Sequence, residues 1–284
     1  YMMTNSEPWD NLKYDEKGVD EVRRKFFGTL YNTYSFFSGY ANVDAFDNEA
    51  AQVPVAERPE IDRWVLSVLN TLVKGVQKER ESYDPTRAGR LIEDFVNNDL
   101  SNWYVRLNRK RFWGKEMSQD KLAAYQTLYT CLTTVAKLLA PFAPFFADQL
   151  FCDLGAAQLE NTTSVHLAKF PVADESLIDR ELEERMGMAQ KITSMVHALR
   201  KKVNIAVRQP LQAIMIPAVD DEQRRHIEAV KDLILSEVNV KELRFVEGSG
   251  VLVKKVKCNF RTMGKKFGKL MKGIAAAMSA LDQD

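Results

Sequence analysis

One short stretch of the sequence combines the two kinds of side chain that bind single-stranded RNA. Between residues 101 and 115 every charged residue is positive: Arg106, Arg109, Lys110, Arg111 and Lys115. They are interleaved with the aromatic residues Trp103, Tyr104, Phe112 and Trp113. A guanidinium group can form paired hydrogen bonds with phosphate, and an exposed ring can stack on an unpaired base. The stretch is therefore a candidate for binding RNA.

Helical geometry divides the same stretch into two faces. Spacings of four, three and four residues place one set on a single stripe, namely Asn102, Arg106, Arg109 and Trp113. A neighbouring apolar stripe, which we expect to face a core, consists of Val96, Leu100, Trp103 and Leu107. We predict that the first stripe contacts RNA together with Lys110. A solvated face whose arginine stems cover core aromatics is the alternative, and the residue types alone leave both open.

Two further groups of basic residues are candidates for the same role. Residues 251–272 contain eight lysines and arginines and no acid, and the candidate RNA contacts among them are Lys254, Lys257, Arg261, Lys265, Lys266 and Lys269. Such a block either repels itself or neutralises a polyanion, and we favour the polyanion. A smaller cluster consists of Arg200, Lys201, Lys202 and Arg208.

Motifs for enzyme catalysis or metal binding are missing from this pattern. The three histidines stand apart in sequence, without a His-Glu-x-x-His helix or an acidic pair at metal-ligand spacing. The three cysteines form no Cys-x-x-Cys pair, which argues against a disulfide framework and a thiolate zinc site and suits a reducing cytosol. Residues 264–270 resemble a phosphate-binding loop, but one residue is lacking between the glycines and Leu270 stands where Ser or Thr must hold magnesium. We therefore predict no catalytic residue, no metal site and no cofactor in this chain.

Composition and hydrophobic periodicity predict a mainly α-helical protein of about two domains. Of the 284 residues 45% are hydrophobic and 28% are charged, the net charge is +1, and the longest apolar stretch, 134–151, is too interrupted to span a membrane. The apolar spacing predicts amphipathic helices over residues 19–37, 60–82, 86–113 and 118–140, and a short helix that opens at Pro144 and is closed by Gly155. Helices of this length with short connections form an antiparallel helical bundle.

The second half predicts a small α+β domain after the bundle. We expect a charged helix over 181–202, strands at 212–216, 240–246 and 251–257, and a helix over 221–235 between the first two strands. Because residues 248–250 are suited to a hairpin turn, we expect the sheet to be antiparallel.

Residues 96–113 as a whole closely resemble the signature helix of the anticodon-binding domain in isoleucyl-tRNA synthetases. Valyl and leucyl enzymes share the Trp-Tyr pair, and the ending Arg-x-x-Arg-x-Arg-Phe-Trp is similar to the isoleucyl branch. Residues 207–211, 239–243 and 259–269 are similar to the C-terminal extension of the eukaryotic-like isoleucyl enzymes, which some bacteria also carry. Residues 4–11 resemble the stretch that follows the catalytic KMSKS loop. The resemblance covers essentially the whole chain in the right order.

The resemblance implies a division of the chain and a role for it. Residues 1–14 would end the connection to the catalytic domain, 15–156 would form the anticodon-binding bundle, and 157–284 would be an incomplete C-terminal extension. The parent enzyme would use ATP and magnesium to activate isoleucine and then transfer it to tRNA(Ile). This chain lacks the HIGH and KMSKS motifs, the editing insertion and the four-cysteine zinc module that some bacterial enzymes carry. We expect it to position tRNA, to be inactive alone, and to be monomeric and cytoplasmic.

Three other interpretations remain. The parent could be the valyl enzyme, which the Arg-Phe-Trp ending and residues 259–269 disfavour. The chain could be a freestanding RNA-binding or chaperone-like helical module, and an upstream reading frame with HIGH and KMSKS would exclude that. A purely structural helical scaffold would show no salt-dependent affinity for RNA.

Overall fold

A computed structural model describes residues 15–217 and 220–246, together with the single positions 9, 11, 268, 273 and 274. The described residues divide into two compact units, one ending at Gln190 and the other beginning at Lys191. None of the helices in these ranges is long and apolar enough to cross a membrane.

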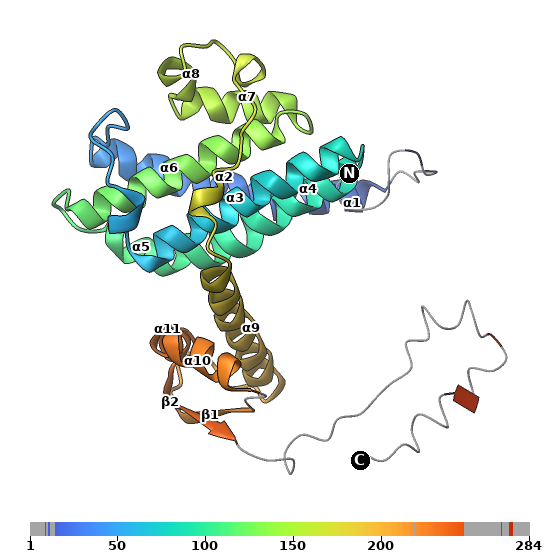
Figure 1. The fold of residues 1–284 in the computed structure, drawn as a ribbon, viewed down its shortest axis with the longest axis vertical. Helices are drawn as coiled ribbons and strands as arrows, with labels where there is room; N and C mark the ends of the chain where they lie inside the picture. The colour runs from blue at the N-terminus through green and yellow to red at the C-terminus, as the bar shows by residue number, and fades with distance from the viewer. Residues whose placement is uncertain are drawn as a thin grey trace. The chain divides into compact units, whose positions relative to one another are not determined.

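The first unit is a bundle of helices that run along one another (Figure 1). Two of its members are continuous helical rods built from several segments. The first comprises α1 (Glu16–Val22), the π-helical segment η1 (Arg23–Phe27) and α2 (Gly28–Val43). The second comprises α4 (Pro85–Asp94), the π-helical segment η3 (Phe95–Val105) and α5 (Arg106–Phe112). α3 (Glu60–Glu81) packs against the second rod and against α6 (Gln119–Leu139). The predicted antiparallel helical bundle is confirmed.

Shorter elements complete the first unit. They are η2 (Val55–Glu57), α7 (Pro144–Asp153), α8 (Ala156–Leu159), η4 (Val165–Leu167), η5 (Glu175–Leu177) and the first half of α9 (Arg180–Lys202). The bundle-forming contacts extend past residue 156: η4 contacts α6 and α7, and η5 contacts α3. Residues 157–190 thus belong to the same compact unit as the bundle. The sequence-based expectation had placed them in the C-terminal extension that begins at residue 157.

The ends of the helices follow the local signals in the sequence. Pro85 occupies the first turn of α4, where its missing N–H is not needed, and Asp84 accepts a hydrogen bond from the Arg87 amide. The Ser118 side chain caps α6 by accepting from the Lys121 amide. Gly155 follows α7 with a φ of 71°, the left-handed conformation expected of a glycine that closes a helix. These signals explain why the predicted helix boundaries lie within a few residues of the observed ones.

Large aromatic side chains fill the core of the bundle. Trp64, Tyr104 and Phe112 are each no more than 1% exposed, and Trp103 is 4% exposed, as the apolar stripe predicts. Tyr125 from α6 lies edge-on to Phe112, with ring centroids 4.9 Å apart. The basic and aromatic stretch is thereby anchored in the core through its apolar face.

The second unit contains β1 (Leu211–Pro217), α10 (Asp221–Ala229), α11 (Lys231–Val238) and β2 (Val240–Val246). The two strands pair in parallel, with Leu211 opposite Val240, so the prediction of an antiparallel sheet is wrong for them. The reason is the crossover: α10 and α11 carry the chain back to the end where β1 began, and parallel strands require such a connection. Asn239, which has a φ of 51°, ends the helical crossover directly before β2. The predicted strand 251–257 and turn 248–250 lie outside the described residues.

A largely buried carboxylate connects η3 with α9. The Gln190 side chain donates a hydrogen bond of 2.9 Å to Oδ1 of Asp99. Burial raises the pKa of Asp99 to about 6, and this outweighs the opposite effect of the Gln190 hydrogen bond. Asp94 and Glu183 act in the same direction as burial because their charges repel an ionised Asp99.

We expect Asp99→Asn to stabilise the first unit at neutral pH. Between an unfolded pKa of about 3.9 and the native pKa of about 6, the native state holds a proton that the unfolded state has lost. The free energy of unfolding therefore falls as pH rises through this window, by on the order of 2 kcal/mol, and the loss is complete above it. Asparagine keeps an oxygen for Gln190 and carries no charge. Urea unfolding followed by tryptophan fluorescence should show the full gain at pH 7.5 and a much smaller gain at pH 4.5.

The exposed Glu184→Gln is the matched control, since it removes one charge from α9 without altering a buried group. An Asp99→Asn variant no more stable than the unsubstituted chain at pH 7.5 would contradict the burial argument.

Candidate nucleic-acid interface

The stripe predicted to contact RNA lies on the surface of the rod formed by η3 and α5. All five of its candidate residues are exposed: Asn102, Arg106, Arg109, Lys110 and Trp113. The Trp113 side chain, at the end of α5, is 57% exposed. Val96, Leu100 and Trp103, on the apolar stripe, are each at most 4% exposed. The prediction of an exposed basic face is therefore confirmed, and the predicted apolar face is buried except at Leu107, which is half-buried.

The segment η3 within this rod is π-helical. Trp103, Tyr104 and Val105 are three consecutive residues, and all are at most 4% exposed. A π-helix has i→i+5 hydrogen bonds and more residues in each turn, so neighbouring side chains can share the buried face. Residue spacings of three and four are those of a uniform α-helix, so this π-helical segment could not be predicted from them.

Arg106 begins α5 at the point where the π-helical segment ends. Its Nε donates to the Asn102 carbonyl at 2.9 Å, and its guanidinium carbon lies 5.8 Å from the centre of the Trp103 ring. These contacts direct the side chain along the helix surface while its charge stays exposed. Arg106 and Asn102 thus belong to one surface.

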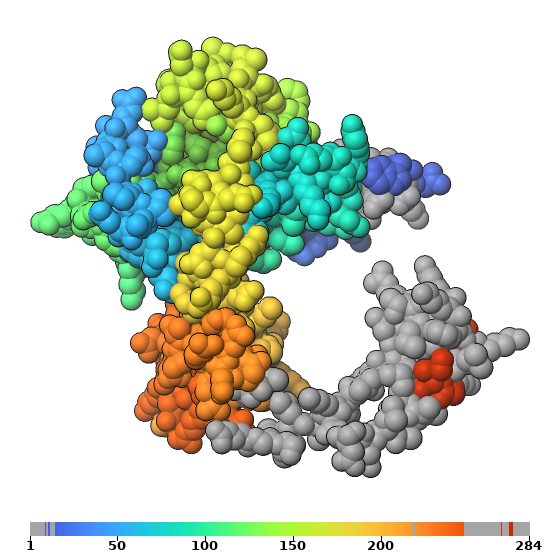
Figure 2. Space-filling view, viewed as in Figure 1, coloured from blue at the N-terminus to red at the C-terminus, as the bar shows by residue number. Residues whose placement is uncertain are grey.

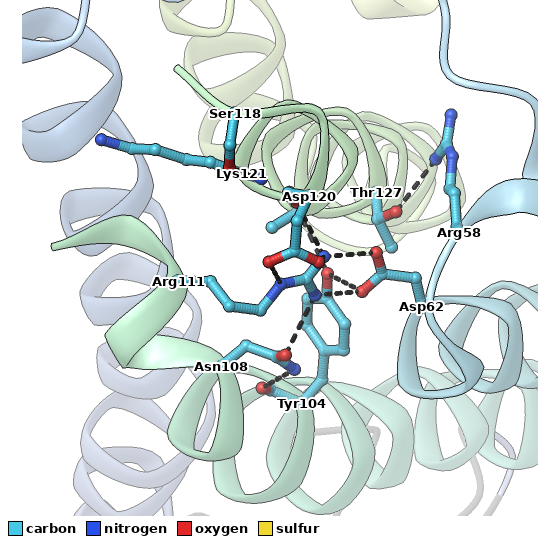
Figure 3. A network of polar contacts seen from close by, with 10 residues as sticks. Arg58, Asp62, Tyr104, Asn108, Arg111, Ser118, Asp120, Lys121 and Thr127 are labelled. Carbon is cyan, nitrogen blue, oxygen red and sulfur yellow. Dashed lines mark hydrogen bonds and ion pairs between the residues drawn. The ribbon is translucent and has the colours of Figure 1, made fainter. Parts of the chain in front are cut away.

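Arg111 differs from the other basic residues of the stretch because its guanidinium pairs with a buried carboxylate inside the bundle (Figure 3). Its two terminal nitrogens lie 2.6 Å and 2.9 Å from the two oxygens of Asp62 on α3. Its Nε donates to Asp120 on α6 at 2.9 Å. The Tyr104 hydroxyl donates to the same Asp62 carboxylate at 2.8 Å. One arginine therefore joins α3, α5 and α6.

The electrostatics of this network favour the charged pair. Asp62 is fully buried, and the Arg111 side chain is 14% exposed. Burial alone lowers the pKa of Arg111, but the hydrogen bonds and charge of Asp62 outweigh it and leave that pKa raised. Burial, followed by the negative charge of Asp62, raises the pKa of Tyr104, so this hydroxyl stays protonated and can donate.

The loop between α5 and α6 is fixed at both ends. Residues 113–118 are all exposed, and they include Trp113, Lys115 and Met117. The Lys121 ammonium donates to the Gly114 carbonyl and lies 2.6 Å from the carboxylate of Asp44. Together with the contact between Arg111 and Asp120, this holds Trp113 on a supported loop next to Arg109 and Lys110.

Arg200 must be removed from the candidate RNA surface. It is 3% exposed, and its terminal nitrogens donate to four backbone carbonyls, those of Ala206, Gln209, Val238 and Asn239. These bonds join α9 to the segments that directly precede β1 and β2, so the residue serves the fold of the second unit. Its neighbours Lys201, Lys202 and Arg208 are exposed and remain candidates. The candidates Lys254, Lys257, Arg261, Lys265, Lys266 and Lys269 lie outside the described residues.

Within the described ranges, no three His, Cys, Asp or Glu side chains gather in a way that could hold a metal ion. Burial raises the pKa of the Cys131 thiol, which disfavours the reactive thiolate.

Comparison with known proteins gives the class of this helical bundle. The sequence model described as "Anticodon-binding domain of tRNA ligase" matches residues 62–215, more than half of the chain. The chain therefore belongs to this family.

The relatives that resemble it are isoleucine–tRNA ligases. The chain is 67% identical to the enzyme named so in Bacteroides thetaiotaomicron, over all of this chain and 25% of that protein. It is 61% identical to that of Porphyromonas gingivalis and 39% identical to that of Clostridium novyi, in both cases over the whole of this chain. It spans about a quarter of the length of these relatives. The resemblance recognised in residues 96–113 is confirmed.

The contrast between Arg111 and Arg109 can be measured directly. Arg111→Ala leaves the buried Asp62 charge without its partner, and we expect it to lower the free energy of unfolding by about 3–5 kcal/mol. Arg109→Ala removes the same side chain from an exposed position two residues earlier, and we expect a change of no more than about 0.5 kcal/mol. Urea unfolding of both variants tests the assignment. Equal effects of the two substitutions would refute it.

Proposed function

We propose that this chain is the tRNA-binding region of an isoleucine–tRNA ligase and that it holds tRNA(Ile) at its anticodon arm. The observation that carries the proposal is the exposed stripe of Asn102, Arg106, Arg109 and Trp113 on a domain of the anticodon-binding family. The names of the relatives support isoleucine as the amino acid.

In this proposal the basic residues of the stripe contact phosphates and Trp113 contacts a base. Arg106, Arg109 and Lys110 pair with backbone phosphates, where a planar guanidinium gives two hydrogen bonds and an ammonium acts as a point charge. Trp113, supported by the loop that Lys121 holds, offers a ring face to an unpaired base. Lys201, Lys202 and Arg208 form a second basic surface on the other unit. The basic residues of 254–269 would add phosphate contacts of the same kind.

The chemistry of the whole enzyme belongs to the rest of the protein. In our proposal the parent activates isoleucine with ATP and magnesium and transfers it to tRNA(Ile), as a monomer in the cytoplasm. The sequence of this chain contains neither of the motifs with which the family holds ATP. Its contribution is the binding energy and orientation of the tRNA.

Replacing two arginines of the stripe should weaken tRNA binding without weakening the fold. We expect Arg106→Ala with Arg109→Ala to reduce the affinity for tRNA(Ile) at least tenfold at low salt. Each lost phosphate contact should also reduce the slope of log K against log salt by about 0.7–0.9. Filter binding over a range of salt concentrations measures both quantities. The melting temperature should hardly move, because both side chains are exposed.

Two controls separate binding from folding. Lys17→Ala with Lys78→Ala removes the same charge from exposed positions on α1 and α3 and should change affinity much less. Trp103→Ala removes a core side chain and should cost about 3–5 kcal/mol of stability. The stripe is structural, and the RNA surface lies elsewhere, if the double arginine variant melts as early as Trp103→Ala.

The isolated chain should be catalytically inactive. We expect no isoleucine-dependent exchange of pyrophosphate into ATP and no charging of tRNA(Ile), because the ATP-holding motifs are lacking from this sequence. Exchange assays with the purified chain and a heat-denatured control test this. Any isoleucine-dependent signal above the control would contradict the proposed division of labour.

A further inference from the structure

Three exposed apolar side chains lie where α2 ends and where α5 is connected to α6. Val43 is the last residue of α2 and is 83% exposed. Trp113 and Met117, in the connection between α5 and α6, are 57% and 42% exposed. Single exposed apolar residues are common on protein surfaces, whereas a cluster of them marks a contact site. Their meaning therefore depends on whether the two segments lie side by side.

Lys121, which is 2% exposed, holds the two segments together. Its ammonium donates to the Gly114 carbonyl and lies 2.6 Å from Oδ2 of Asp44, and its amide donates to the Ser118 hydroxyl at 3.1 Å. These three partners directly follow the exposed apolar residues in the chain, which are Val43, Trp113 and Met117. Figure 2 shows the connection between α5 and α6 (green) projecting beside the segment that follows α2 (light blue).

Aromatic rings join the same two segments from the core. Phe36 and Tyr40 on α2 have ring centroids 5.1 Å and 6.4 Å from that of Phe112, the last residue of α5. Phe112 is 1% exposed and directly precedes Trp113. The ends of α2 and α5 are thus held by packing as well as by Lys121. A surface that is fixed before binding loses little conformational freedom when it is occupied.

The surroundings of the three side chains favour RNA over a protein as the occupant. Arg109 and Lys110 lie within about one helical turn of Trp113, and the exposed Lys115 stands in the connection itself, whose residues 113–118 include one acid, Glu116. This excess of positive charge attracts a polyanion. Three side chains cover roughly the area of one base, whereas a stable protein interface needs about 800 Å² from each partner.

We propose that Val43 and Met117 join Trp113 in holding one unpaired base of the RNA that the basic stripe binds, an inference that rests on the proposed function. Val43 and Met117 carry no strong hydrogen-bonding group, and Trp113 contributes the face of its ring. Contacts of this kind depend on the flat face of a base and tolerate any of the four bases. The site therefore requires that a base is present and does not select which one it is.

The test is filter binding of the intact chain to an RNA hairpin with the sequence of the anticodon arm of tRNA(Ile). Val43→Ser with Met117→Ser should weaken binding about tenfold. The slope of log K against log salt should stay unchanged, because no phosphate contact is lost. Val172→Ser with Met195→Ser is the matched control, since it removes the same side chains from exposed positions elsewhere and should bind as the unsubstituted chain does. Both variants should keep the melting temperature.

An abasic nucleotide, placed at each loop position in turn, locates the contact. At one position the loss of the base should weaken binding to the unsubstituted chain about tenfold. The same loss should cost the Val43→Ser, Met117→Ser variant much less, because two interacting groups do not add their effects when both are removed. Exchange of that base for another should change the affinity less than threefold.

The base site and the proposed function fail in different ways. A hairpin that does not bind the unsubstituted chain at low salt would overturn both. A hairpin that loses affinity with Arg106→Ala and Arg109→Ala, but not with Val43→Ser and Met117→Ser, would overturn the base site alone and leave these side chains to a protein partner. Equal weakening in the control variant, or a base exchange as costly as base removal, would also overturn the base site.

Discussion

The buried contact between Asp62 and Arg111 is the constraint on which the arrangement of the bundle depends. Asp62 is fully buried, so its charge is tolerable only while a cation and a hydroxyl reach it. Arg111 and Tyr104 meet this demand from the same rod, which fixes the rotation of the rod about its axis. Successive residues of an α-helix point about 100° apart. With Arg111 turned inward, Arg109, Lys110 and Trp113 are therefore left on the surface.

Much of this organisation could be predicted from the sequence because it depends on local chemistry. Pro85, Ser118 and Gly155 mark helix ends by mechanisms that act within a few residues. The spacing of Leu100 and Trp103 places both in the core, and the basic stripe follows as its complement. Local capping and periodicity are thus sufficient to predict the helical bundle and its exposed basic face.

What could not be predicted depends on partners far away in the sequence. Arg111 and Arg200 stand in basic runs and look like their neighbours, yet one binds a carboxylate 49 residues earlier and the other binds carbonyls 38 and 39 residues later. Arginine suits both tasks, since its fork of donors fits phosphate, carboxylate or a set of carbonyls equally well. The parallel pairing of β1 and β2 could not be predicted for a related reason. Residues 248–250 favour a hairpin turn and hence an antiparallel sheet, whereas the direction of β2 is determined by the crossover helices α10 and α11.

The parallel pairing of the second unit also has a consequence for how the chain is made. During synthesis β1 leaves the ribosome long before β2, and Leu211 has no partner strand until Val240 has been added. Likewise, Arg200 cannot donate to the carbonyls of Val238 and Asn239 until these residues have been added to the chain. The helices of the bundle precede β1 in the chain, so they are synthesised before it. The nascent chain should therefore complete its bundle first, while the open edge of β1 depends on continued elongation, or on a chaperone, for protection from aggregation.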